Sequence, residues 1–123
     1  KMKEDNIRVL KVEPQKEPEV VTLKNDLESM QEAVGGLIEI IDLSETACVL
    51  CNEEGKLDGL EGNRSLGNDI LVGTFYVTGS DYDGNLCSLS DSEITEYTSQ
   101  FLEPETFKPE EIEAATGFIF LSF

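Results

Sequence analysis

Two strand-sized apolar runs on either side of a glycine-rich acidic loop constrain the fold of this chain most. Residues 48–51 read Cys-Val-Leu-Cys, and residues 69–75 read Asp-Ile-Leu-Val-Gly-Thr-Phe. The loop between them contains Gly55, Gly59 and Gly62 among acidic residues. Apolar runs separated by turn-forming residues are typical of two core strands joined by an ordered connection. The stretch therefore predicts a sheet at the centre of a small folded domain.

The rest of the chain predicts an α+β fold. Alternating apolar and β-branched residues indicate strands at 7–12, 19–23, 37–43, 46–51 and 73–78. Helical spacing predicts helices at 26–34, 91–102 and 109–115, and one helical turn capped by Asp69 at 70–72. Asn25 and Ser90 are the expected N-caps of the first two helices, each with a glutamate three residues later. We expect a mixed, mostly antiparallel sheet of about five to seven strands, with two or three short helices on one face.

The length of 123 residues favours one domain. We expect a flexible leader at 1–6, a single α+β domain at 7–102, and a C-terminal extension at 103–123 that forms a short helix and then a strand at 118–123. No apolar run of about twenty residues is present, so no membrane association is expected. No signal peptide is visible, and three cysteines cannot all pair within the chain, so a cytoplasmic location is expected.

The charge distribution excludes one class of function. The chain has 26 acidic residues against 9 basic ones, a net charge of −17, and six of the nine cations lie in the first 24 residues. Direct nucleic-acid binding needs many Lys and Arg side chains on one surface, which this chain lacks. The acidity is explained either by solubility alone or by a basic partner protein.

Three motifs that often carry chemistry have ordinary structural explanations here. Cys48 and Cys51 form a C-x-x-C, but on a strand this spacing points the thiols to opposite faces, and the chain has no His to complete a metal site. The run at 81–85 lacks the spacing of a calcium loop and is typical of a hairpin turn. Arg64 is expected to pair with a local carboxylate. No catalytic residue, metal or cofactor is therefore predicted.

Several sequence blocks, in order, resemble a known family. They are Ile-Arg-Val-Leu-Lys-Val-Glu-Pro near the start, Leu-Glu-Ser-Met-Gln-Glu-Ala-Val-Gly-Gly-Leu-Ile-Glu-Ile, Cys-Asn-Glu-Glu-Gly-Lys-Leu at 51–57, Gly-Asn-Arg at 62–64, and Asp-Ile-Leu-Val-Gly-Thr-Phe at 69–75. Together they resemble the family of the domain of unknown function 3846, over roughly residues 7–101. Proteins of that family are carried by phages, plasmids and conjugative elements.

The resemblance implies a role in conflict with the host. Some similar proteins are anti-CRISPR proteins, which inhibit the RNA-guided nuclease of type II systems. Such a nuclease holds its nucleic acids in a positively charged channel, so an acidic domain is expected to block guide RNA loading by stoichiometric binding. The expected contact residues are the acids of the loops and of the second helix: Glu53, Glu54, Asp58, Glu61, Asp81, Asp83, Asp91, Glu93 and Glu96. The alternatives are a nuclease that trims the guide RNA, or an accessory interaction domain without inhibitory activity.

Overall fold

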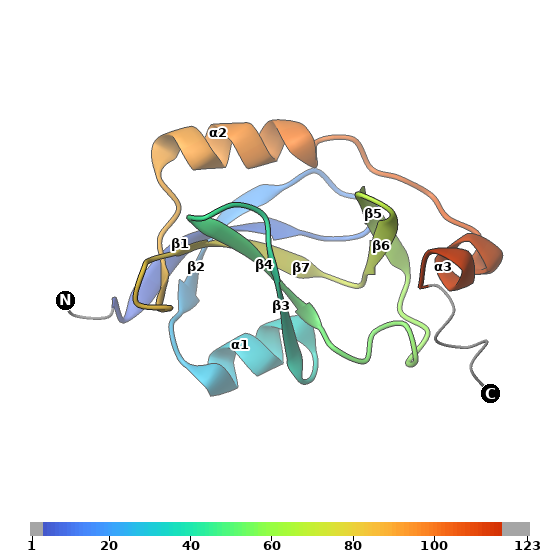
Figure 1. Ribbon diagram of the computed structural model, residues 1–123, viewed down its shortest axis with the longest axis horizontal. Coiled ribbons are helices and arrows are strands. Elements are labelled where there is room, and N and C mark those ends of the chain that lie inside the picture. Colours follow the sequence, from blue (N-terminus) through green and yellow to red (C-terminus); the bar gives the residue numbers. More distant parts are fainter. Residues whose placement is uncertain (1–3, 117–123) are drawn as a thin grey trace.

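The structure, a computed structural model, describes residues 4–116 and places an antiparallel sheet between two helices (Figure 1). The third helix lies beside one end of the sheet. In chain order the elements are β1 (Asn6–Val12), β2 (Glu19–Lys24), α1 (Leu27–Val34), β3 (Ile38–Asp42), β4 (Ala47–Asn52), β5 (Gly62–Leu66), β6 (Asp69–Val72), β7 (Phe75–Ser80), β8 (Leu86–Cys87), α2 (Asp91–Gln100) and α3 (Pro109–Thr116). None of these helices has the length and apolar character needed to cross a membrane.

The main sheet has six strands in the order β2-β1-β7-β4-β3, with β8 paired to β7, and β5 and β6 form a separate two-stranded sheet. Every pairing in the described part of the chain is antiparallel. The predicted α+β class with a mostly antiparallel sheet is therefore confirmed. The strand order places β3 at one edge of the sheet and β2 at the other.

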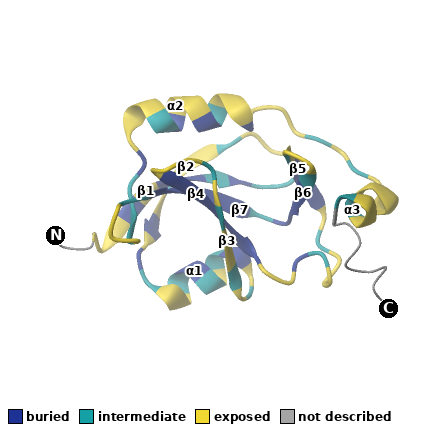
Figure 2. Cartoon of the chain, viewed as in Figure 1, coloured by how far each residue is buried: buried dark blue, intermediate teal, exposed yellow. Residues whose placement is uncertain are grey.

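The sequence predicted helices on one face of the sheet, and this was wrong: α1 and α2 cover opposite faces. Figure 1 shows α2 above the sheet and α1 below it. The reason lies in β4, in which all six residues are buried. Cys48 and Leu50 belong to the core between the sheet and α1, whereas Val49 and Cys51 belong to the core between the sheet and α2. A strand that is apolar on both faces needs cover on both sides. Figure 2 shows the resulting buried strands between helices with exposed outer faces.

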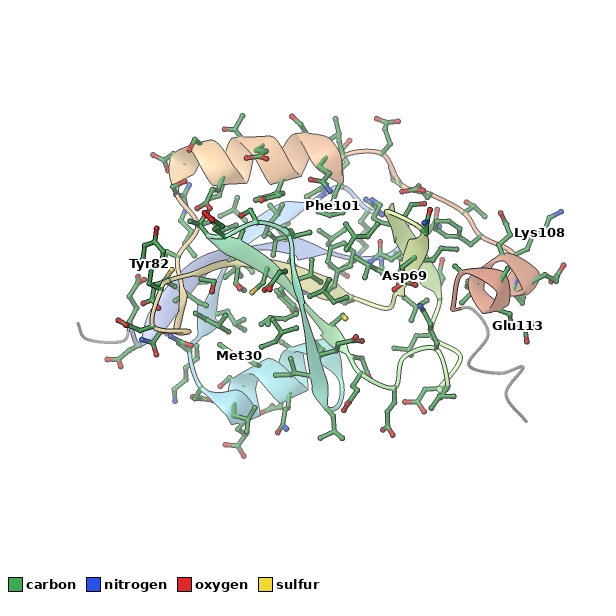
Figure 3. The ribbon with its side chains drawn as sticks, in the orientation of Figure 1. Met30, Asp69, Tyr82, Phe101, Lys108 and Glu113 are labelled. Carbon is green, nitrogen blue, oxygen red and sulfur yellow. The ribbon has the colours of Figure 1, made fainter. Side chains whose placement is uncertain are left out.

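Each core is closed by one helix. Met30 of α1 is buried against the first core, and Phe101 at the end of α2 is buried in the second (Figure 3). The rings of Phe101 and Phe75 meet edge to face, with centroids 5.2 Å apart. Leu27, expected on the apolar stripe of α1, is 65% exposed, whereas Met30 and Val34 of the same stripe are buried.

Helix caps follow the predictions at one helix and differ by one residue at the other. Ser90 and Glu93 form the expected capping box of α2. At α1 the cap is Asp26, whose carboxylate accepts from the Ser29 N–H at 2.7 Å. Asn25 is buried instead, and its amide donates to the carbonyls of Glu4 (2.8 Å) and Leu86 (3.1 Å). Tertiary hydrogen bonds therefore replace its predicted capping role.

The segment between β4 and β7 also differs from the prediction. Asp69 begins β6 rather than capping a helical turn, because residues 69–72 pair with β5. The β5–β6 hairpin is held from outside by the C-terminal extension. The Glu105 carboxylate accepts from the Ser65 N–H at 3.0 Å and from its hydroxyl at 2.7 Å, and a Cβ added at Gly62 would lie 2.8 Å from a ring carbon of Phe107.

The segments predicted at the two ends of the chain are described only in part. Within the expected leader, the Glu4 carboxylate accepts from the Ser88 N–H at 3.1 Å and from its hydroxyl at 3.0 Å, and the Asp5 carbonyl accepts from the Asn25 N–H at 2.8 Å. Residues 1–3 of that leader, and the strand predicted at 118–123, lie outside the described residues. The helix predicted at 109–115 is present as α3.

Candidate acidic binding groove

The nine acidic residues predicted as contacts lie in three separate regions. Glu53, Glu54, Asp58 and Glu61 are exposed in the loop between β4 and β5. The turn that contains Asp81 and Asp83, marked by Tyr82 in Figure 3, lies at the opposite end of the sheet. The remaining three, Asp91, Glu93 and Glu96, lie on α2 above the sheet. The fold therefore does not bring the nine residues together on one surface.

Three of the nine have structural partners within the chain. Asp91 forms an ion pair with Arg8 at 2.7 Å. Glu93 accepts from the Ser90 N–H at 2.9 Å and from the Thr46 hydroxyl at 2.7 Å. The Asp81 carboxylate accepts from two backbone N–H groups of its own turn, each at 2.9 Å. These carboxylates stabilise local structure, so they are poorer candidates for binding a partner than the loop residues are.

The structure groups a different set of acids around β3. One cavity of about 410 Å³ lies between β3, the β4–β5 loop and β6, and it is lined by Glu39, Glu53 and Asp69. A second, of about 430 Å³, lies between β3, the β5–β6 turn and α2, and it is lined by Asp42, Asp69 and Glu96. Ile41 and Asp69 line both cavities. We call these two adjoining cavities, with their five acids, the β3 groove.

The floor of the β3 groove is apolar. Among the lining residues of the first cavity, Cys51 and Leu71 are buried and Ile41 is half-buried, and Leu57 adds an apolar side chain that is 70% exposed. Burial, together with the charges of Glu39 and Asp69, raises the pKa of the Cys51 thiol to about 12, and Lys56 partly opposes this shift. The thiol is therefore neutral at physiological pH and behaves as an apolar side chain.

Electrostatically the groove is negative. Lys56 is the one cation among its lining residues, and it forms a close ion pair with Asp69. Glu39, Glu53 and Glu96 have no cationic partner within 4.0 Å among residues 4–116. An apolar floor with unpaired carboxylates at its rim matches the side chains of Lys and Arg, which combine an apolar stem with a cationic head. The groove is thus suited to a basic, partly apolar ligand surface.

The other motifs of the sequence are structural. Cys48 and Cys51 lie in separate cores on opposite faces of β4, as predicted, and no cysteine of the described chain forms a disulfide. The turn at 81–85 joins β7 to β8, as predicted. The prediction for Arg64 was wrong: its guanidinium is buried and donates to three backbone carbonyls rather than to a carboxylate. Residues 4–116 hold no group of three potential metal ligands.

Comparison with known proteins identifies the family. The family model described as a domain of unknown function, DUF3846, matches residues 7–102. The chain belongs to the DUF3846 family. No curated protein and no solved structure matches it.

Every residue of the β3 groove falls inside the DUF3846 match, whereas α3 falls outside it. Sequence reasoning selected Glu53 and Glu96 of this groove but missed Glu39, Asp42 and Asp69. The signal for Glu39 was present, since it is the one charged residue in Leu-Ile-Glu-Ile-Ile at 37–41. Asp69 of β6 lines the same cavity as Glu39 in this DUF3846 domain, whereas Glu96 of α2 lines the adjoining one, and both placements follow from the tertiary fold alone.

Proposed function

We propose that this DUF3846 protein is a stoichiometric inhibitor that acts in the cytoplasm of a host cell. It binds a basic surface of a host defence nuclease, an RNA-guided enzyme of the type II CRISPR kind, and prevents guide RNA from loading. The contact surface is the β3 groove with the adjoining β4–β5 loop. The observation that carries the proposal is the set of carboxylates around apolar lining residues, of which Glu39, Glu53 and Glu96 have no cationic partner among residues 4–116.

The charge of the whole molecule supports the same conclusion. A net charge of −17 on 123 residues attracts a cationic partner over roughly a Debye length, about 10 Å at 0.1 M salt, and accelerates encounter. A channel that binds an RNA–DNA heteroduplex through its backbone presents the Lys and Arg side chains that such a surface needs. Carboxylates bound there occupy the cations that the guide RNA would otherwise contact.

Charge reversal in the groove tests the proposal. Glu39→Lys with Glu53→Lys removes two unpaired rim carboxylates and is expected to weaken inhibition of guide RNA loading at least roughly tenfold, because like charges then face the basic partner. The measurement is the concentration of protein that halves formation of the nuclease–guide complex. Raising the salt concentration is expected to weaken the wild-type protein more steeply than this variant.

The matched control is Glu28→Lys with Glu32→Lys. These exposed residues lie on α1, across the sheet from the groove, and their reversal changes the net charge equally. Inhibition is expected to stay close to that of the wild-type protein. Equal loss in both variants would mean that total charge, rather than the groove, determines binding. Shortened guide RNA on a denaturing gel would show that the protein is a nuclease rather than an inhibitor. The absence of any effect, whatever the order of addition, would favour an accessory interaction domain.

A further inference from the structure

β3 forms an edge of the main sheet, and within the described chain it pairs with β4 alone. The hydrogen-bond pattern shows which of its backbone groups face outward. The Leu37 carbonyl accepts from the Glu53 N–H at 2.8 Å, and the Leu43 N–H donates to the Ala47 carbonyl at 3.0 Å. In an antiparallel ladder alternate residues bond to the same neighbour. The odd-numbered residues of β3 therefore face β4, and the N–H and C=O groups of Ile38, Ile40 and Asp42 face away from the sheet.

This edge has a regular geometry. Five consecutive residue pairs join β3 to β4 without a shift in register, and the strand contains neither proline nor glycine. Proteins commonly block an exposed edge with a bulge, a proline or a covering segment. At β3 the sequence supplies charge instead, through Glu39 and Asp42, which repels an acidic strand and attracts a basic one.

The two sides of the edge differ in chemistry. On one side Glu39 and Ile41 line the β3 groove. On the other side Ile38 and Ile40 line a third cavity, of about 380 Å³, beside Leu27 of α1. Ile40 is 56% exposed and Leu27 is 65% exposed, so this side is an open apolar surface. The cavities therefore lie on both faces of the same free strand.

We propose that β3 accepts an extended segment of a partner protein as an additional strand, and that this segment alternates cationic and apolar residues. Main-chain hydrogen bonds to the outward groups of Ile38, Ile40 and Asp42 would hold it, and successive side chains would point to opposite faces. Its cationic side chains lie on the side of Glu39 and Glu53, and its apolar ones on the side of Ile40. The inference rests on the proposed function only for the positive charge of the partner.

A second copy of the chain is a poorer occupant of this edge. Each copy has a net charge of −17, and pairing two β3 strands would bring the five carboxylates of one groove close to those of the other. Like charges at that separation repel. A basic segment neutralises the same carboxylates, so charge complementarity selects the partner strand over self-association.

The test uses a synthetic peptide of about seven residues that alternates valine and lysine. Its control is an isomer with the lysines and valines in two blocks, which has the same charge without the alternation. We expect the alternating peptide to bind at least roughly tenfold more tightly than the block isomer. At saturation, exchange of the Ile40 amide with solvent is expected to slow at least roughly tenfold, because that N–H becomes hydrogen-bonded. The amide signals are followed by NMR on the whole protein.

Proline substitution provides a matched pair of variants. Ile40→Pro removes one outward N–H of β3 and no bond to β4, and is expected to abolish binding of the alternating peptide. Thr22→Pro does the same at the other edge, since the bond from the Asn25 N–H to the Asp5 carbonyl places the Thr22 N–H outward on β2. That variant is expected to bind like the wild-type protein. Thermal melting checks that both variants remain folded. If Ile40→Pro unfolds, exchange of the Ile40 amide in the wild-type protein with the alternating peptide tests strand addition instead.

Three binding results would overturn the proposal, and so would unchanged inhibition by the Ile40→Pro variant. Equal binding of the two peptides would mean attraction by charge without strand pairing. A concentration-dependent dimer with a protected Ile40 amide would assign the edge to a second copy. Binding gained only after removal of residues 117–123 would assign the edge to the chain's own end.

If Ile40→Pro still inhibits the nuclease like the wild-type protein, strand addition fails while the inhibitor role stands. If the peptide binds but no nuclease is inhibited, the reverse holds.

Discussion

Arg64 is 1% exposed and joins three distant parts of the chain. Its guanidinium donates to the carbonyl of Phe101 at 2.9 Å, to that of Lys16 at 2.5 Å and to the side chain of Asn63 at 2.8 Å. Burial lowers the pKa of Arg64, and the charge of Glu105 partly offsets this. One side chain thus ties together the end of α2, the β1–β2 turn and β5.

We expect Arg64→Lys to lower the free energy of unfolding by about 3 kcal/mol, because a single ammonium group cannot reach carbonyls that the planar guanidinium spans, and buried acceptors then lose their partners. Urea unfolding followed by circular dichroism measures the change. Arg8→Lys is the control, since Arg8 forms an exposed ion pair with Asp91, and a change within about 0.5 kcal/mol is expected there. A loss below about 1 kcal/mol for Arg64→Lys would contradict this assignment.

The role of Arg64 shows what the sequence leaves open at the scale of residues. A buried arginine is usually paired with a carboxylate, which is why a local acid was the natural prediction. Besides the adjacent Asn63, its acceptors are carbonyls from residues 37 and 48 positions away along the chain. Carbonyls occur at every residue, so no side-chain pattern could identify them. The burial of Cys48 and Cys51, in contrast, followed directly from their place in an apolar strand.

Among the secondary-structure elements, α2 depends on its capping box. Burial disfavours the charged form of Glu93, but hydrogen bonds from the Ser90 N–H, the Thr46 hydroxyl and the Ser90 side chain outweigh it, so the pKa of Glu93 is lowered. A carboxyl group with a lowered pKa stabilises the fold above its unfolded-state pKa, and this contribution disappears as the pH falls through the folded-state value. The stabilisation is therefore present at neutral pH and is lost in acid, below about pH 4.5.

We expect Glu93→Ala to lower the free energy of unfolding by about 1 kcal/mol at pH 7, since a helix cap of this kind contributes that much. The difference from the wild-type protein is expected to shrink as the pH is lowered below about 4. Chemical unfolding at several pH values measures both effects. Glu96→Ala is the control on the same helix, because Glu96 is exposed and lies outside the capping box. A difference that persists unchanged at acid pH would contradict the role of the Glu93 charge.

Elements with local signals were predictable, and those defined by distant pairing were not. The capping box of α2 and the glycine that ends α1, Gly35 with φ 81°, are contained in a few consecutive residues. In contrast, β6 was predicted as a helical turn. Its four residues form a strand only through pairing with β5, and this pairing contains a register shift near Gly62. The faces covered by α1 and α2 were also predicted incorrectly, although β4 carries a local signal for them, since a strand that is apolar on both faces needs cover on both sides.

At the scale of the whole molecule, the charge is expected to oppose folding. Most of the 26 acidic residues come closer together in the folded state than in the unfolded chain, and the five described ion pairs involve few of them. Raising sodium chloride from roughly 20 mM to 200 mM is expected to raise the free energy of unfolding by about 1 kcal/mol through screening. Thermal unfolding at each salt concentration measures this. A lower stability at the higher salt would mean that attractive pairs dominate instead.

The candidate site also belongs to this scale. The sequence alone predicted an acidic protein with a basic partner, and it placed Glu53 and Glu96 among the contacts. It could not show that these two residues share a groove with Asp69, because the groove forms where β6 and α2 meet the edge strand β3. Composition therefore predicted the chemistry of a partner, whereas topology determines which residues form the proposed contact surface.

The middle strand of the sheet follows both of its neighbours in the chain. β7 lies between β1 and β4, so during translation the hairpins β1–β2 and β3–β4 leave the ribosome before the strand that joins them. Until then each hairpin exposes to water apolar residues that are buried in the finished sheet, such as Val9 and Val49. Nascent chains with open edges tend to associate. Residues 1–52 already carry eleven acidic residues against six basic ones, and repulsion between the excess carboxylates of neighbouring nascent chains opposes this association.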